Sequence, residues 1–211
     1  MLIKEITLPR NLLQVSQATL PDQQITVLLG PNGSGKSTLL AYLATHLPEC
    51  AYLPQQNQSY DALSVDDLLT LGQQRATSPL TIDIVTELEL APLLAKQVNQ
   101  LSGGQQQRVW IAFILLQNAP VILLDEPLNG LDLRYQQRLL QLLPQLKTTI
   151  LMVVHDLNYA YRVADWIWLV SAATLNEGQP SNIMTTTDLT ATFATPVSLH
   201  QTVDGAVAFW I

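Results

Sequence analysis

The sequence predicts an α/β fold with a mostly parallel sheet, and three observations support this prediction. Short apolar runs typical of buried strands recur along the chain, stretches with helical periodicity lie between them, and a glycine-rich loop joins one strand to the helix after it. With 211 residues, 48% of them hydrophobic, the chain is long enough to bury a core of its own. We therefore expect a single domain over residues 1–211.

The first half of the chain contains two predicted strands and two predicted helices. Residues 25–29 (ITVLL) form a run that ends in the glycine-rich turn, and residues 37–47 (STLLAYLATHL) have helical spacing. Residues 51–53 are a second strand candidate, and residues 65–74 again show helical periodicity. This alternation is typical of parallel sheets, because their strands are joined by crossover helices.

The second half continues the alternation. Residues 81–90 (TIDIVTELEL) predict a further helix with Ser78 or Thr81 as its N-cap, and another helix is expected from the glycine pair onward, over residues 103–117. The remaining predicted strands are apolar throughout, as expected of strands buried on both faces: residues 121–124, 150–154 and 166–170.

Composition and charge exclude several classes of protein. The net charge of −7 argues against a nucleic-acid partner, which proteins bind by neutralising phosphates with basic side chains. One cysteine, Cys50, is too few for an internal disulfide. The N-terminus MLIKEITLPR lacks the features of a secretory leader, and the longest apolar run, residues 109–116, is far shorter than the ~20 residues that span a bilayer. We expect a chain that is not exported by that route and does not itself cross a membrane.

A phosphate-binding loop is predicted at GPNGSGKST. The spacing matches G-x-x-x-x-G-K-[ST], and the loop lies between a predicted strand and the start of a helix. Backbone N–H groups, the helix dipole and the Lys36 charge would all attract a nucleoside triphosphate, while the Ser37 hydroxyl would bind Mg²⁺. The residues expected to hold the nucleotide are Gly30, Pro31, Asn32, Gly33, Ser34, Gly35, Lys36, Ser37 and Thr38.

A second strand end supplies the acids that such a loop needs. In VILLDEP, Asp125 follows a buried run and emerges at the carboxyl end of the strand, which is the edge where ligands bind in open α/β sheets. We therefore expect Asp125 to hold Mg²⁺. Glu126, the next residue, is free to orient a water molecule.

The motif LSGGQ, residues 101–105, places two glycines at a helix start, where they are destabilising. Together with the phosphate-binding loop and the strand that ends in Asp-Glu, this motif resembles the signature of the ATP-binding-cassette (ABC) family, and the resemblance extends over essentially the whole chain. It implies a P-loop ATPase that forms a homodimer when ATP is bound. In that family the signature of one subunit caps the γ-phosphate held by the other, which assigns nucleotide contacts to Ser102, Gly103, Gly104 and Gln105.

Three further positions match the family. Gln55 in YLPQQ corresponds to the glutamine that reaches the metal and the attacking water, although Gln56 beside it leaves the assignment open. Asp132 in NGLD matches the aspartate that crosses the dimer interface. His155 in VVHD matches the histidine that contacts the γ-phosphate. The resemblance thus implies that Lys36, Gln55, Glu126 and His155 perform the catalysis, with ATP and Mg²⁺ as cofactors and Ser37, Asp125 and Gln55 around the metal.

Two stretches narrow the resemblance to a subfamily. LDLRYQQ, with Gln136, and HDLNYAYRVAD, with Asn158 and Asp165, are similar to the cassettes of importers for iron–siderophore complexes, haem and cobalamin. This similarity implies a peripheral subunit on the cytoplasmic face of the cell membrane, an integral membrane permease and an extracytoplasmic binding protein. Three alternatives stay open: the cassette of a zinc, manganese or other ABC transporter, an ABC ATPase without a transport role, and a regulatory nucleotide-binding module.

The sequence also departs from the family pattern. Only 19 positions separate Lys36 from Gln55, so the antiparallel β-lobe that the family inserts there should be reduced. Residues 1–30 contain no Phe, Trp or Tyr, so the aromatic side chain that stacks on adenine in the family is missing, and nucleotide choice should be loose. We expect a helical subdomain at about residues 62–112, inserted into a core of about residues 1–61 and 113–211.

Overall fold

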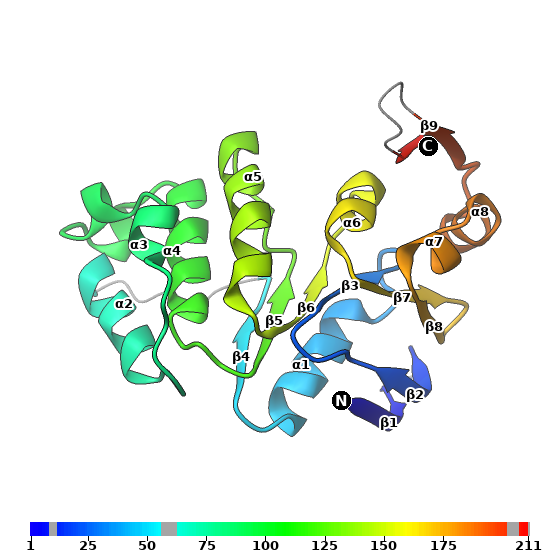
Figure 1. Cartoon of the computed structure of the whole chain (residues 1–211), viewed down its shortest axis with the longest axis horizontal. Coiled ribbons are helices and arrows are strands. Elements are labelled where there is room, and N and C mark those ends of the chain that lie inside the picture. Colours follow the sequence, from blue (N-terminus) through cyan, green and yellow to red (C-terminus); the bar gives the residue numbers. More distant parts are fainter. Residues whose placement is uncertain (9–11, 56–62, 202–206, 211) are drawn as a thin grey trace.

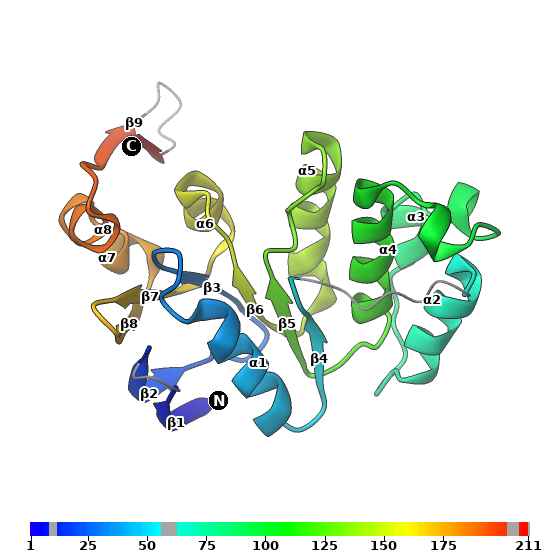
Figure 2. The same ribbon diagram turned by 180° about the vertical axis from the view of Figure 1, so that it is seen from behind.

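The computed structural model describes residues 1–8, 12–55, 63–201 and 207–210. Within these residues, one large sheet has the strand order β1-β2-β8-β7-β3-β6-β5-β4 (Figures 1 and 2). Its strands are β1 (Leu2–Thr7), β2 (Gln14–Thr19), β3 (Ile25–Leu29), β4 (Cys50–Leu53), β5 (Val121–Asp125), β6 (Thr149–Val153), β7 (Trp166–Ser171) and β8 (Thr174–Gly178). A separate hairpin consists of β9 (Ser198–Gln201) and β10 (Val207–Trp210).

The centre of the large sheet is parallel. Strands β4, β5, β6, β3 and β7 pair in parallel in that order, whereas β7–β8 and β1–β2 pair antiparallel. The predicted α/β fold with a mostly parallel sheet is therefore confirmed. Since only α1 and β4 lie between Lys36 and Gln55, the antiparallel part of the sheet is confined to the edge that contains β1, β2 and β8.

The helices are α1 (Lys36–His46), α2 (Val65–Gln74), α3 (Ile84–Glu87), α4 (Gly103–Leu115), α5 (Leu133–Leu142), α6 (Leu157–Val163), α7 (Pro180–Ile183) and α8 (Thr186–Phe193). The helix predicted at residues 81–90 is a single turn, α3, and its predicted caps are wrong. Asp83 is the N-cap instead, because its carboxylate accepts from the backbone N–H of Thr86 at 3.1 Å.

Two hydrophobic cores lie on opposite faces of the sheet. In β3, for example, Val27 is buried in the core that includes side chains of α4, α5 and α6, whereas Leu28 is buried with side chains of α1, β1 and β2. This alternation follows from the period of two in a strand. Strands buried on both faces are apolar throughout, which explains why they could be found from the sequence.

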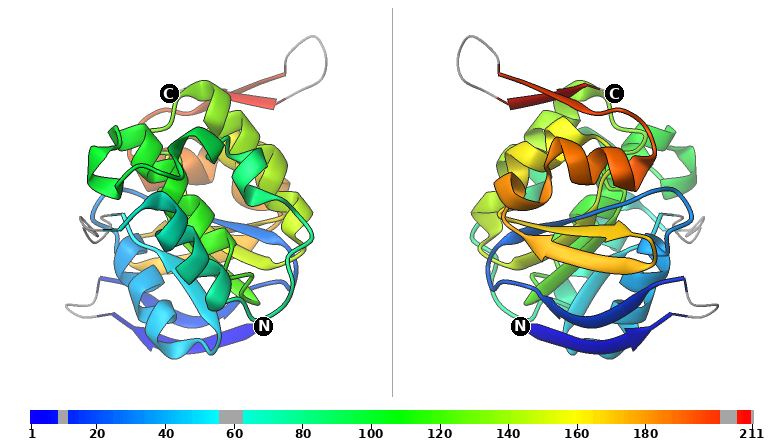
Figure 3. Two further views of the ribbon diagram at one scale, coloured as in Figure 1. Left: turned by 90° about the vertical axis from the view of Figure 1, so that its left-hand side faces the viewer. Right: turned by 90° about the vertical axis from the view of Figure 1, so that its right-hand side faces the viewer.

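Helices α2, α3 and α4 form a helical lobe beyond the β4 and β5 side of the sheet (Figures 1 and 3). A Cβ atom on Gly72 of α2 would lie 2.8 Å from the carbonyl oxygen of Phe113 in α4, so these two helices approach closely. Glu89 joins the lobe to α5, because its carboxylate accepts from the Tyr135 hydroxyl at 2.8 Å and contacts Arg134 and, at 3.1 Å, Arg138.

At the other edge of the sheet, one carboxylate forms hydrogen bonds with three strands. Glu177 Oε2 accepts from the backbone N–H of Thr19 at 2.6 Å, from the Trp166 indole at 3.1 Å and from the Trp168 indole at 3.2 Å. Strands β2, β7 and β8 thereby share one acceptor, in addition to the single residue pair that joins β2 to β8. The hairpin of β9 and β10 lies against α6, where the Asn158 amide exchanges two hydrogen bonds with the backbone of Phe209.

Candidate functional site

The phosphate-binding loop connects β3 to α1 through glycines whose backbone is strained for other residues. Gly35 has a φ of +94° and is the N-cap of α1, so the helix begins at Lys36 with its first N–H groups directed into the loop. A Cβ atom on Gly30 would lie 2.9 Å from the carbonyl oxygen of Val170 in β7. The loop therefore follows the sheet closely and leaves its outer side to a ligand.

Lys36 is buried in this loop, with 6% of its surface exposed. Its ammonium group donates to the carbonyl oxygens of Gly30 and Pro31, both at 2.8 Å. Burial lowers the pKa of Lys36, while the negative charges of Glu126 and Asp125 oppose that shift. Among the described residues, the hydrogen bonds of the ammonium go to backbone carbonyls, which a phosphate with its full negative charge can displace.

Asp125 ends β5 beside this loop and is almost completely buried. Among the residues that the structure describes, its Oδ1 atom has no hydrogen-bond partner. Burial raises the pKa of Asp125, and Glu126 adds to the rise, while a hydrogen bond from Ser37 and the charge of Lys36 oppose it. A buried carboxylate oxygen without a donor, next to a serine hydroxyl, is the oxygen-only environment that Mg²⁺ prefers. These residues therefore fit a magnesium ion.

Glu126 is the meeting point of three side chains. Its Oε1 atom lies 2.7 Å from His155 Nε2, and its Oε2 atom accepts from Gln55 Nε2 at 3.1 Å and from Asn129 Nδ2. Strand β4 delivers Gln55, β6 delivers His155, and β5 delivers Glu126 itself, so three neighbouring strands end at one carboxylate. Gln56, the other candidate for the metal-reaching glutamine, lies outside the described residues.

A hollow of about 380 Å³ opens over the phosphate-binding loop. It is lined by Leu12, Asn32, Gly33, Gly35, Lys36, Ser37, Thr38, Gln55 and Glu126. A second hollow of about 200 Å³ lies on the other side of Glu126 and includes His155, Asn129 and Gln136. Glu126 therefore separates two polar spaces at the carboxyl ends of the strands.

The signature residues lie elsewhere in the same chain. None of Ser102, Gly103, Gly104 and Gln105 lines the hollow over the phosphate-binding loop, and neither does Asp132, whose carboxylate caps α5 by accepting from the backbone N–H of Tyr135 at 3.1 Å. Ser102 is the N-cap of α4, and its backbone N–H donates to the side chain of Gln105 at 3.1 Å.

The two signature glycines have different surroundings. A Cβ atom on Gly103 would meet nothing within 4 Å, whereas one on Gly104 would lie 2.8 Å from the carbonyl oxygen of Gly130. Gly104 thus allows a close approach within the chain, while Gly103 leaves its N-terminal helix turn open to a ligand from outside.

Comparison with known proteins adds to this geometry. The ABC transporter family description matches residues 13–50 and 44–129. The iron(3+)-hydroxamate import ATP-binding protein FhuC of Bacillus subtilis (strain 168) is 36% identical over 79% of this chain and 76% of that protein. The chain belongs to the ABC transporter family.

Two further similarities agree with this family. The vitamin B12 import ATP-binding protein BtuD of Citrobacter koseri is 36% identical over 79% of this chain and 80% of that protein. A solved ABC transporter of metal-chelate type, in an inward-facing conformation, matches with a TM-score of 0.77 and 28% identity over 94% of this chain and 88% of its own. The recognised family, its nucleotide binding and its ATPase class are therefore confirmed, and a membrane permease is the partner that an ABC transporter subunit requires.

As an ABC transporter subunit, the chain brings together most of the residues that the sequence named. Lys36, Ser37, Gln55 and Glu126 line one hollow, and His155 contacts Glu126. Sequence reasoning missed Asn129, although it lies in the NGLD stretch that was singled out for Asp132. It also missed Leu12, the large apolar side chain that lines the hollow over the phosphate-binding loop. Among the described residues, no helix is long and apolar enough to cross a membrane.

Proposed function

We propose that this chain is the ATP-hydrolysing subunit of an importer for iron–siderophore complexes, haem or cobalamin. The observation that supports ATP hydrolysis most strongly is the convergence of Gln55 and His155 on Glu126, beside the hollow of the phosphate-binding loop. The cargo is proposed from the printed names of the relatives, which import iron(3+)-hydroxamate and vitamin B12.

In this proposal the loop binds ATP by its phosphates. The residues from Gly30 to Thr38 present their N–H groups to the phosphates, and the Lys36 ammonium leaves the carbonyls of Gly30 and Pro31 for the β- and γ-phosphates. Ser37, Asp125 and Gln55 would hold Mg²⁺. When bound, this ion neutralises charge that develops on the phosphates. The raised pKa of Asp125 supports this assignment, because a cation beside the carboxylate relieves the penalty of its burial.

Hydrolysis follows from the position of Glu126. A water molecule attacks the γ-phosphorus, the bond between that phosphorus and the oxygen of the ADP leaving group breaks, and Glu126 accepts the proton of the water. His155 and Gln55 fix the Glu126 carboxylate through the contacts at 2.7 and 3.1 Å. The chain contributes positioning and electrostatic stabilisation, and forms no covalent intermediate.

The signature motif is proposed to act on the nucleotide of a second copy. The helix turn at Ser102 and Gly103 is exposed, and none of the described residues lies within 4 Å of where a Gly103 Cβ atom would be. Because these residues do not line the chain's own hollow, they serve the γ-phosphate of the partner in a head-to-tail homodimer. Asp132 then contacts the partner chain across the interface, and Gln105 stays with the signature turn.

This dimer can be tested with the full chain in light scattering. Glu126→Gln keeps the shape of the carboxylate but cannot accept the proton, so hydrolysis should slow by ~10²–10⁴-fold and ATP should trap a dimer. Adding Ser102→Arg should abolish the dimer and leave ATP binding intact, because the bulky cation fills the signature turn alone. A Glu126→Gln protein that stays monomeric at saturating ATP contradicts the proposed dimer.

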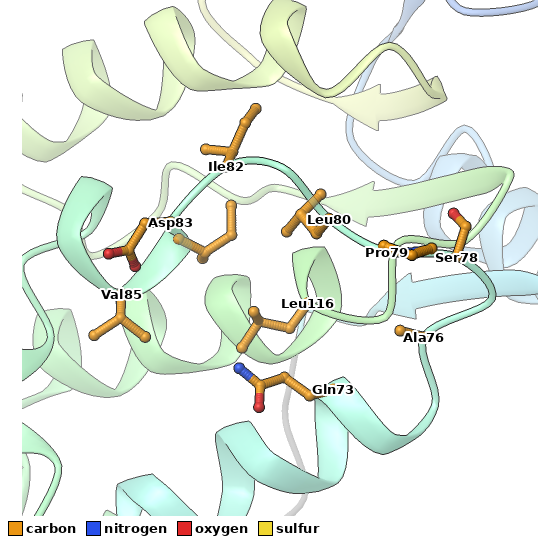
Figure 4. Close-up of a pocket in the computed structure, with 10 residues that line it drawn as sticks. Gln73, Ala76, Ser78, Pro79, Leu80, Ile82, Asp83, Val85 and Leu116 are labelled. Carbon is orange, nitrogen blue, oxygen red and sulfur yellow. The ribbon is translucent and has the colours of Figure 1, made fainter.

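The permease is proposed to contact the helical lobe. A hollow of about 370 Å³ lies there between the end of α2 and the segment before α3, and Figure 4 shows Leu80, Leu116 and Gln73 around it. It shares no lining residue with the hollow over the phosphate-binding loop, so both can be filled at once.

We further propose that the chain is a peripheral subunit on the cytoplasmic face of the membrane. It would act together with an extracytoplasmic binding protein and without nucleic acid. The helical lobe would be an inserted subdomain at about residues 62–112, between core segments 1–61 and 113–211.

A growth experiment tests the cargo. Deletion of the gene should impair growth when iron is limiting and supplied as a siderophore or haem complex, or when cobalamin must be taken up. The same cells complemented with the wild-type chain should grow normally, and cells complemented with Glu126→Gln should not. Normal uptake of all three cargoes in the deletion strain would contradict the proposed cargo and direct the search to zinc or manganese.

A further inference from the structure

Asn129 is a third donor to the Glu126 carboxylate. Its side-chain amide donates to Glu126 Oε2, the same oxygen that accepts from Gln55, while Oε1 faces His155. A carboxylate offers about four acceptor positions. Three donors fill all but one of them, and the remaining position is available to accept a hydrogen bond from the water molecule that attacks the γ-phosphate.

The backbone at Glu126 needs such support. Glu126 has a φ of +51°, a conformation that residues with a side chain rarely adopt, and it persists only where the surrounding contacts hold it. The backbone N–H of Asn129 donates to the Glu126 carbonyl oxygen at 3.1 Å, which closes a tight turn. The Asn129 side chain therefore returns directly to the residue that begins its own turn.

The loop that contains Asn129 is fixed from two sides. Gln107 of the signature helix α4 donates to the Pro127 carbonyl oxygen at 3.1 Å, and Gly104 lies against the carbonyl of Gly130. From the other side, Gln136 of α5 donates to the Leu131 carbonyl oxygen at 3.0 Å. Asn129 is thus presented by a loop whose backbone is held independently of the Asn129 side chain.

We propose that Asn129 is a positioning residue for the hydrolysis of ATP. By donating to Oε2, it holds the Glu126 carboxylate in one rotamer, so that a single acceptor position faces the attacking water. The inference rests on the proposed function, in which Glu126 accepts the proton of that water. Asn129 is not proposed to touch the nucleotide. Removal of its side-chain amide should therefore affect kcat and leave KM for ATP nearly unchanged.

Two substitutions separate the donated hydrogen bond from simple packing. Asn129→Ala removes the donor, and a lost hydrogen bond to a charged group should lower kcat by about 10- to 100-fold. Asn129→Asp keeps the shape of the side chain but replaces the donor with an acceptor that repels Glu126, so kcat should fall at least as far. A packing role would instead make the Asp variant the milder of the two.

The measurement is single-turnover hydrolysis of ATP with Mg²⁺ by the full chain in excess, together with the KM for ATP under multiple turnover. In a Glu126→Gln background, Asn129→Asp should have little further effect, because the two residues act through one carboxylate. The control is Gln136→Ala, which removes a hydrogen bond to the same loop without touching Glu126 and should change kcat far less than Asn129→Ala.

Different outcomes would contradict the positioning role of Asn129 and the proposed hydrolysis of ATP. A Glu126→Gln variant that hydrolyses ATP as fast as the wild type would overturn the proposed function itself. A slow Glu126→Gln variant, together with Asn129→Ala and Asn129→Asp variants that keep the wild-type kcat, would overturn only the positioning role. The positioning role would also be overturned if Gln136→Ala slows hydrolysis as much as Asn129→Ala does, since displacement of the loop would then explain both effects.

Discussion

Asp125→Asn should stabilise this protein in the absence of nucleotide and metal. Asp125 is 2% exposed, its Oδ1 atom has no partner within the described part of the chain, and burial raises its pKa, so the charged carboxylate is less stable here than in water. Asparagine has the same shape and no charge. The variant therefore removes the electrostatic penalty and keeps the packing at the end of β5.

The expected gain is modest because contributions of opposite sign combine. A buried polar atom without a partner costs about 1–3 kcal/mol, and more when it is charged. The variant recovers only the part that is due to charge, since Oδ1 stays unpaired, and it loses the attraction to Lys36 and the hydrogen bond from Ser37. A net gain of about 1 kcal/mol should raise Tm by about 2–4 °C in a chain of this length.

Thermal unfolding followed by circular dichroism measures this effect, with EDTA in one series and Mg²⁺ and ATP in another. In EDTA the variant should unfold at the higher temperature. With ligand at 100 times its Kd, the wild type should gain about 2.7 kcal/mol, while the variant should gain less because one metal-holding oxygen is no longer charged. The advantage in Tm that the variant has in EDTA should therefore shrink. A variant that is less stable than the wild type in EDTA would refute the reasoning and show that Lys36 and Ser37 outweigh the burial penalty.

The effect of pH has a definite sign. Because the pKa of Asp125 is raised in the folded protein, folded Asp125 retains its proton at pH values where the unfolded chain has lost it. The penalty is absent below the unfolded pKa, where both states are protonated, grows as pH rises from the unfolded to the folded pKa, and is complete above the folded pKa. In EDTA, the difference in Tm between Asp125→Asn and the wild type should therefore shrink toward acidic pH. A difference that grows on acidification would contradict this assignment.

Three other predictions concern the nucleotide and the signature. Lys36→Ala should lower the affinity for ATP by about 10-fold or more in calorimetry, since it removes a charged donor to phosphate, and unchanged affinity would contradict this. GTP should compete with ATP within about tenfold, a 1.4 kcal/mol margin, because Leu12 in the hollow cannot stack as an aromatic ring does; a hundredfold preference for ATP would be incompatible with this. Gly104→Ala should lower Tm, because its Cβ would lie 2.8 Å from the Gly130 carbonyl oxygen, whereas Gly103→Ala should leave Tm equal or higher. Equal losses in the two variants would count against the different surroundings of the two glycines.

Features that depend on short stretches of sequence could be predicted. The apolar run before Asp125 is β5, and the carboxylate lies at its carboxyl end, because a strand buried on both faces needs apolar residues at every position. His155 could be placed for the same reason, since it follows the buried strand β6. The phosphate-binding loop could be found because its function depends on spacing within nine residues.

Features that depend on the geometry of particular turns, caps and irregular strands could not be predicted. Strands β1 and β2, at one edge of the sheet, both begin with the burial pattern exposed, buried, exposed, exposed, buried, which departs from the period of two expected of a strand, and they pair antiparallel with each other. The N-cap of α3 was misplaced because Asp83 competes with nearby serine and threonine residues for the same role. Asn129 escaped notice because its importance lies in a hydrogen bond to Glu126, which only the turn between them brings about.

The tryptophans of this chain lie in three separate regions and give it internal optical probes. Trp166 and Trp168 both donate to the Glu177 carboxylate near the edge of the sheet that contains β1, β2 and β8. Trp110 packs edge-to-face on Phe113 in the helical lobe. Trp210 is largely exposed on the hairpin of β9 and β10. If the tryptophans of two regions are replaced with phenylalanine, the remaining fluorescence emission reports on the third region alone. Chemical denaturation of such variants can then show whether sheet edge, helical lobe and hairpin melt at one denaturant concentration or in succession, without attaching any dye.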